Sequence, residues 1–195
     1  MSTKKTFVSD IKAIRERARS HIEDGAVTQG YSADRDAVVR ILNEALATEI
    51  VCTLRYKRHY YMANGIHAKS VAAEFLEHAN EEQEHADRIA KRIVQLGGAP
   101  NLSPDGLLSR SHSECAEGDD LVEMLEEDLV AERIAIDTYR DIIQYLGNDD
   151  PTSRRMMEEI LAKEEEHAED IGSLLKELGK KGEPAKRSAP RSAFG

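Results

Sequence analysis

The chain of 195 residues is acidic, with 37 Asp and Glu against 27 Lys and Arg, and only 5% of its residues are aromatic. At roughly 150 residues per domain, this length predicts one domain with extensions. Ala, Leu, Glu, Lys and Arg dominate over the residues that favour strands, which excludes an all-β fold. Residues 1–20 lack the apolar core of a signal peptide, and no run of about 20 apolar residues occurs. We therefore expect a cytoplasmic protein with no membrane association.

Charge is distributed unevenly along the chain. Residues 25–179 hold 16 Lys and Arg against 32 Asp and Glu, whereas residues 180–195 hold five against one. An acidic body attracts cations and repels nucleic acid, so only the basic end could contact phosphates. This end predicts weak DNA binding through Lys180, Lys181, Lys186, Arg187 and Arg191.

The first 33 residues read as an N-terminal extension, in which Ile11, Ile14 and Ile22 would share one face of a short amphipathic helix. Residues 34–178 follow as one bundle, and residues 179–195 as a basic disordered tail. Glycines mark the expected helix ends, and either Asp149 or Asp150 can cap the last helix. The bundle contains four expected helices: Asp34–Asn64, Ala68–Leu96, Asp119–Gly147 and Pro151–Leu178.

The connections between these helices differ in length. The first pair and the second pair are joined by a few residues each, so each pair should form an antiparallel hairpin. The middle connection, residues 97–118, is long enough to run the whole length of a bundle. We therefore predict an all-α four-helix bundle with a long crossover between the second and third helices.

Each expected helix places one Glu in the middle of its apolar stripe, and two helices add a His one turn later. Four uncompensated acids inside a core would unfold the domain or take up protons. Two divalent cations would balance four carboxylates, and this donor set favours iron, with manganese or zinc as substitutes. The candidate ligands are Glu49, Glu82, His85, Glu132, Glu164 and His167.

The two hairpins also repeat one another. Residues 81–89 align with residues 163–171 at five of nine positions, and the two motifs contain Glu-x-x-His at the same place. Glu49 precedes Tyr56 by seven residues, as Glu132 precedes Tyr139. The repeat predicts a nearly two-fold symmetric site for two metal ions.

The chain resembles the ferritin-like superfamily and, within it, the bacterioferritin family. The Glu and Glu-x-x-His pattern on four helices carries the resemblance, as do Pro100-Asn101-Leu102 and the segment of residues 156–161. The resemblance covers about residues 37–178. It implies a ferroxidase centre with the six ligands above, Glu82 and Glu164 as bridges, and Tyr56 as the catalytic tyrosine beside the irons.

Two departures from that family change the expectations. Gln83 stands where bacterioferritins carry the haem-ligating Met, so we expect no haem. Gly179, Pro184 and Pro190 prevent a fifth apolar helix after the bundle. A shell of twelve identical chains is therefore favoured over one of twenty-four.

Several residues near the motifs read as ordinary surface or core positions. His78 and Cys52 lie on the apolar stripes as core residues or supports of the centre, and Tyr139 is expected to pack without a further role. The residues that we expect to lie on the surface are Glu81, Glu84, Glu165, Glu166, His21, His59, His67 and His112.

The leading functional hypothesis is iron storage or detoxification by a ferroxidase that oxidises Fe(II) with O2 or H2O2. Two alternatives keep the same fold. A di-iron oxygenase would use the centre on an organic substrate, and a Dps-like miniferritin would protect DNA.

Overall fold

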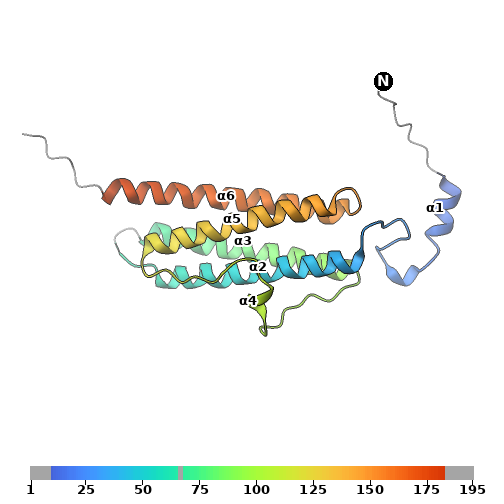
Figure 1. The fold of residues 1–195 in the computed structure, drawn as a ribbon, viewed down its shortest axis with the longest axis horizontal. Helices are drawn as coiled ribbons and strands as arrows, with labels where there is room; N and C mark the ends of the chain where they lie inside the picture. Colours follow the sequence, from blue (N-terminus) through green and yellow to red (C-terminus); the bar gives the residue numbers. More distant parts are fainter. Residues whose placement is uncertain (1–9, 66–67, 183–195) are drawn as a thin grey trace, which may run out of the picture.

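A computed structural model describes residues 10–65 and 68–182, and this part of the chain is helical without any strand. Four long antiparallel helices form a bundle, as Figure 1 shows, so the predicted fold class is confirmed. The helices are α1 (Ile11–Arg17), a 3₁₀ turn (Ile22–Asp24), α2 (Arg35–Met62), α3 (Ala68–Gln95), α4 (Leu107–Arg110), α5 (Leu121–Leu146) and α6 (Pro151–Gly182).

The helices α2, α5 and α6 begin at aspartates, because a carboxylate can accept hydrogen bonds from the free backbone N–H groups of a first turn. Asp34 caps α2, Asp120 caps α5, and Asp150 rather than Asp149 accepts the Ser153 N–H of α6 at 2.9 Å. At its other end α6 continues to Gly182, so the expected stop at Gly179 is wrong. A glycine in a helix costs about 1 kcal/mol, which does not by itself end a 32-residue helix.

The crossover runs alongside α2 in the same direction, as predicted (Figure 1). Asn43 on α2 bonds the backbone of Ala99 and Asn101 near the start of the crossover. Farther along α2, Arg55 donates to the Glu114 carbonyl and Arg58 to the Glu117 carbonyl. These side chains supply hydrogen-bond partners to backbone groups of the crossover, which has little regular secondary structure to pair them.

Two glycines close the turn between α3 and the crossover. Gly97 has a φ of +77°, and the Gly98 N–H bonds the Ile93 carbonyl at 2.9 Å, which closes the helix end. A Cβ on Gly98 would lie 2.6 Å from a methyl group of Val39, so only glycine permits this approach of α3 to α2.

The core consists of two apolar clusters, one toward each end of the bundle. The first apolar cluster includes Leu42, Ile93 and Leu146, and the second includes Phe75 and Leu125. Buried Glu and His side chains fill the space between them. The bundle therefore encloses a polar layer between two hydrophobic cores.

The N-terminal extension lies beyond the bundle end, where α1 points away from the other helices (Figure 1). The helix ends at Arg17 and Ile22 lies in the separate 3₁₀ turn, so the expectation that Ile22 shares its face is wrong. Ile11 and Ile14 are 52% and 42% exposed, so the apolar face of α1 has no partner within the described residues. Residues 1–9 and 183–195, including Lys186, Arg187 and Arg191, lie outside the described residues. None of the described helices has the apolar length that a bilayer crossing requires.

Candidate metal centre

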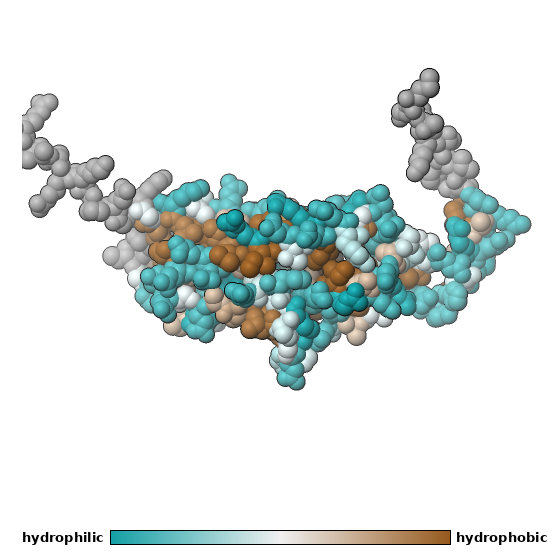
Figure 2. All heavy atoms as spheres, in the orientation of Figure 1, coloured by the Kyte–Doolittle hydropathy of each residue, from teal (hydrophilic) through white to brown (hydrophobic). Residues whose placement is uncertain are grey.

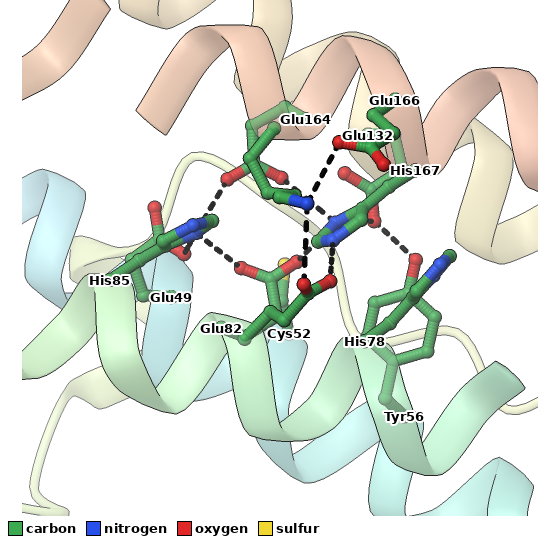
Figure 3. A network of polar contacts seen from close by, with 12 residues as sticks. Glu49, Cys52, Tyr56, His78, Glu82, His85, Glu132, Glu164, Glu166 and His167 are labelled. Carbon is green, nitrogen blue, oxygen red and sulfur yellow. Dashed lines mark hydrogen bonds and ion pairs between the residues drawn. The ribbon is translucent and has the colours of Figure 1, made fainter. Parts of the chain in front are cut away.

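The six predicted ligands converge in the middle of the bundle (Figure 3). Glu49 comes from α2, Glu82 and His85 from α3, Glu132 from α5, and Glu164 and His167 from α6. Five of the six are 1% exposed, and His85 is 5% exposed. The Glu-x-x-His spacing brings each Glu and His together because residues three apart on a helix share one face.

The six side chains form two overlapping groups, each with donor atoms within 4.8 Å of one another. Glu49 and His85 belong to one group, Glu132 and His167 to the other, and Glu82 and Glu164 to both. The His85 Nδ1 atom lies 2.9 Å from Glu164 Oε1, and the His167 Nδ1 atom lies 3.5 Å from Glu164 Oε2. Two cations could thus sit side by side with Glu82 and Glu164 between them.

The donor atoms themselves indicate that protein contacts leave the site incomplete. Both imidazole Nδ1 atoms, both Glu164 oxygens and Glu82 Oε1 are buried and make no hydrogen bond of good geometry, although His85 Nδ1 approaches Glu164 Oε1 to 2.9 Å. Buried polar atoms are normally paired, because an unpaired one costs about 1–3 kcal/mol. Oxygen and imidazole nitrogen are suitable ligands for iron or manganese, so these residues fit a pair of divalent ions.

Burial and mutual repulsion change the proton affinity of the acids. Burial raises the pKa of the Glu49 carboxyl to about 8, with a further contribution from the Glu82 charge. Burial likewise raises the pKa of Glu132. For His167, burial lowers the pKa, but contacts with Glu164 and Glu82 outweigh it and raise the pKa to about 11. Without cations, the cluster therefore holds protons that metal ions would displace.

Two tyrosines cross between the hairpins. Tyr56 on α2 donates a hydrogen bond to Glu132 on α5, and Tyr139 on α5 donates one to Glu49 on α2. The expectation that Tyr139 only packs is therefore wrong. Each phenol therefore orients a carboxylate of the opposite hairpin. The two contacts are symmetric because the two hairpins repeat one another.

Glu81 and His167 form a contact that the sequence reading missed. The Glu81 Oε2 atom lies 2.7 Å from His167 Nε2, and Lys163 Nζ lies 3.3 Å from Glu81 Oε1. Glu81 is therefore a partner of a candidate ligand and not a simple surface charge. Glu165 and Glu166 instead pair with Arg140 and Lys163 near the surface, and Glu84 is exposed.

His59 is fully buried, which corrects its assignment to the surface. Its Nδ1 atom lies 2.8 Å from Asp128 on α5, and Arg55 Nε donates to the same carboxylate at 2.8 Å. Its spacing of seven from Cys52 and three from Tyr56 was the available signal. This network joins α2 to α5 one turn beyond the centre, and Arg55 also lies 3.6 Å from the buried Cys52 sulfur.

The other histidines expected at the surface differ in their exposure. His21 is exposed as expected, whereas His112 is half-buried against Thr48, with 3.0 Å between His112 Nδ1 and Thr48 Oγ1. His67 lies outside the described residues. His78 is buried and stacks on His167, with 4.0 Å between ring centroids.

Comparison with known proteins defines the class to which this bundle belongs. Residues 39–180 match the family model described as a ferritin-like domain. The chain therefore belongs to the ferritin-like family. It is 34% identical to the bacterioferritin of Brucella melitensis over 149 residues, which are 75% of this chain and 87% of that protein. The predicted resemblance to bacterioferritins is thus confirmed.

Two further proteins resemble this chain. The bacterioferritin-related dodecameric thioferritin from Bacteroides fragilis superposes with a TM-score of 0.74 at 31% identity, over 77% of this chain and 90% of that chain. A nutrient stress-induced DNA-binding protein from Nostoc is 32% identical over 138 residues, 69% of this chain and 74% of that protein.

Proposed function

We propose that this protein stores or detoxifies iron and acts as a ferroxidase. The observation that carries the proposal is the cluster of four buried carboxylates and two imidazoles, in which both Nδ1 atoms, both Glu164 oxygens and Glu82 Oε1 make no hydrogen bond of good geometry. One Fe(II) would be held by Glu49 and His85, and the other by Glu132 and His167. Glu82 and Glu164 would be shared, and the family relationship to bacterioferritins supports the same assignment.

Iron, when bound, would supply the redox chemistry, because two Fe(II) ions carry the two electrons needed to reduce O2 to peroxide or H2O2 to water. The four carboxylates neutralise the charge of two divalent ions and keep both inside a core closed to bulk water. Tyr56 would orient Glu132 through its hydrogen bond and, as the catalytic tyrosine of this proposal, would supply an electron or a proton. Glu81 orients the His167 ring.

The proposal is tested by adding Fe(II) and air to the purified protein and measuring oxidation and retained iron. We expect rapid oxidation and far more than two Fe(III) per chain. His85→Ala and His167→Ala should slow oxidation strongly with helix content unchanged. Retention of only two ions per chain would instead favour a di-iron oxygenase.

Storage requires a closed assembly, because the bundle interior is filled by its own side chains. We propose a shell of twelve chains, in line with the dodecameric B. fragilis relative. Figure 2 shows apolar side chains along the exposed side of α5, where Val122 and Val130 are 41% and 49% exposed. Light scattering should give a mass near twelve times 21.8 kDa; a monomer or a mass near twenty-four chains would contradict it.

Weak DNA binding by the basic tail is a secondary proposal, favoured by the similarity to the Nostoc DNA-binding protein. Five cations near an acidic body would give salt-sensitive binding. Deletion of residues 180–195 should abolish a mobility shift at low salt, and an unchanged shift would place the DNA surface elsewhere.

A further inference from the structure

His78 belongs to two groups of potential metal ligands at once. One group contains His78 with Glu132 and His167 of the six-residue centre. The other group contains His78 with Glu74 and Asp170. In each group the donor atoms lie within 4.8 Å of one another. Figure 3 shows the His78 ring beside that centre, next to Tyr56. His78 therefore connects the buried centre to a second, more accessible group of acids.

The outer group, Glu74, His78 and Asp170, forms where α3 packs against α6. Glu74 and His78 are four residues apart and share a helix face, and Glu74 Oε1 lies 3.5 Å from His78 Nε2. Asp170 follows His167 by three residues on α6. Glu74 and Asp170 are both half-buried, whereas the six ligands of the centre are closed off.

Within the described residues, neither Glu74 nor Asp170 has a Lys or Arg at ion-pair distance. Burial, together with the charges of Asp170 and Glu77, raises the pKa of the Glu74 carboxyl. Two like charges facing each other at partial burial lack the cation that would stabilise both. The local charge therefore suits a divalent cation.

The His78 imidazole provides an independent observation. It is 1% exposed, its Nε2 atom is the ring nitrogen that faces Glu74 at 3.5 Å, and its Nδ1 atom has no hydrogen-bond partner. A buried imidazole nitrogen is normally satisfied by a carboxylate, a carbonyl, a water molecule or a metal ion. One imidazole with two carboxylates is a donor set that transition-metal dications accept readily.

We propose that Glu74, His78 and Asp170 form an outer site for one divalent transition-metal cation, a helical turn away from the six-residue centre. The site lies between the surface and the centre, and His78 reaches both. With Fe(II) as the cation, the outer site supplies the centre, a role that rests on the proposed ferroxidase function. Cation binding itself does not depend on that function.

Equilibrium dialysis against Zn(II), which is not oxidised, tests the site. The double variant Glu74→Gln with Asp170→Asn should bind one Zn(II) per chain fewer than the unaltered protein. Glu77→Gln removes an exposed charge from the same face of α3 and serves as the matched control, with no loss expected. Equal binding by the double variant and the unaltered protein, or an equal loss in the control, overturns the outer site.

The design separates this proposal from the proposed function, because it measures a difference between variants. A double variant that retains fewer than two Zn(II) refutes the two-ion centre, while the missing outer ion still supports the outer site. For delivery, the double variant should oxidise limiting Fe(II) about tenfold more slowly, the size of a typical electrostatic steering effect. An unchanged initial rate overturns the delivery role.

Discussion

The two halves of the candidate metal centre have the same types of candidate ligand but different surroundings. In one half, the His85 ring has no hydrogen bond to its Nε2 atom among the described residues. In the other half, Glu81 holds His167 Nε2 at 2.7 Å, and His78 stacks on the same ring. Partners of this kind orient a ligand and raise its basicity. An internal repeat can thus preserve the candidate ligands while the surroundings of the two candidate metal positions become unequal.

The largest expected effect comes from a residue shared by both halves. Glu82→Ala removes a carboxylate from both ligand groups, so Fe(II) oxidation should fall by more than the roughly 10–100-fold loss typical of an outer partner. Stopped-flow absorbance measures the rate, and circular dichroism checks helix content. Glu165→Ala, an exposed acid on α6, is the control. A near-normal rate in Glu82→Ala would mean that the halves do not share this residue.

Acidification should weaken metal binding in both halves of the candidate centre. Glu49 in one half has a pKa of about 8, and His167 in the other has a pKa of about 11, so both carry protons below pH 8. A bound cation must displace these protons, so Zn(II) affinity should fall by about tenfold per pH unit for each proton displaced as pH drops from 8 to 6. Calorimetry in buffers of different ionisation enthalpy measures the protons released. Affinity that stays constant across this range would contradict the assignment.

Only one half should respond to loss of Glu81. Glu81→Gln removes the carboxylate on His167, and affinity for one of the two Zn(II) ions should drop by about tenfold. The ion beside His85 should keep its affinity. Glu84→Gln changes an exposed acid on the same helix and should alter neither. Equal weakening of both ions would show that the halves are coupled through the shared carboxylates.

The smallest effect concerns the tyrosine pair, where the halves are alike. Tyr56→Phe and Tyr139→Phe each remove one buried hydrogen bond to a carboxylate, so each should lower the free energy of unfolding of the metal-free protein by about 1 kcal/mol. Urea denaturation provides the measurement. If Tyr139 only packed, its variant would be as stable as the unaltered protein.

The sequence was sufficient to predict the four helices and the convergence of the six candidate ligands. A buried Glu on an apolar stripe is so costly that its recurrence on four helices, twice with a His one turn later, leaves few structural explanations. Glycine and aspartate marked most helix ends because these residues have specific local geometry. Gly179 failed as a stop because its cost is small compared with that of ending a long helix.

Contacts between helices could not be predicted in this way. Glu81 sits beside the apolar stripe of α3, and only the packing of α6 against α3 brings it to His167. His59 followed the stripe of α2, but its partner Asp128 lies on α5, 69 residues away. Spacing within one helix carries no information on which residue of a distant helix lies opposite.

The placement of a polar layer between two apolar clusters affects how the metal-free bundle opens. Each cluster stabilises its own end, while the layer between them contains unpaired donors and protonated acids. Local opening can therefore begin at one end without disturbing the other, so amide hydrogen exchange should reveal two separate cooperative units. Cations bound by all four helices would join these units, and metal loading would then also determine the mechanical rigidity of each wall of a shell.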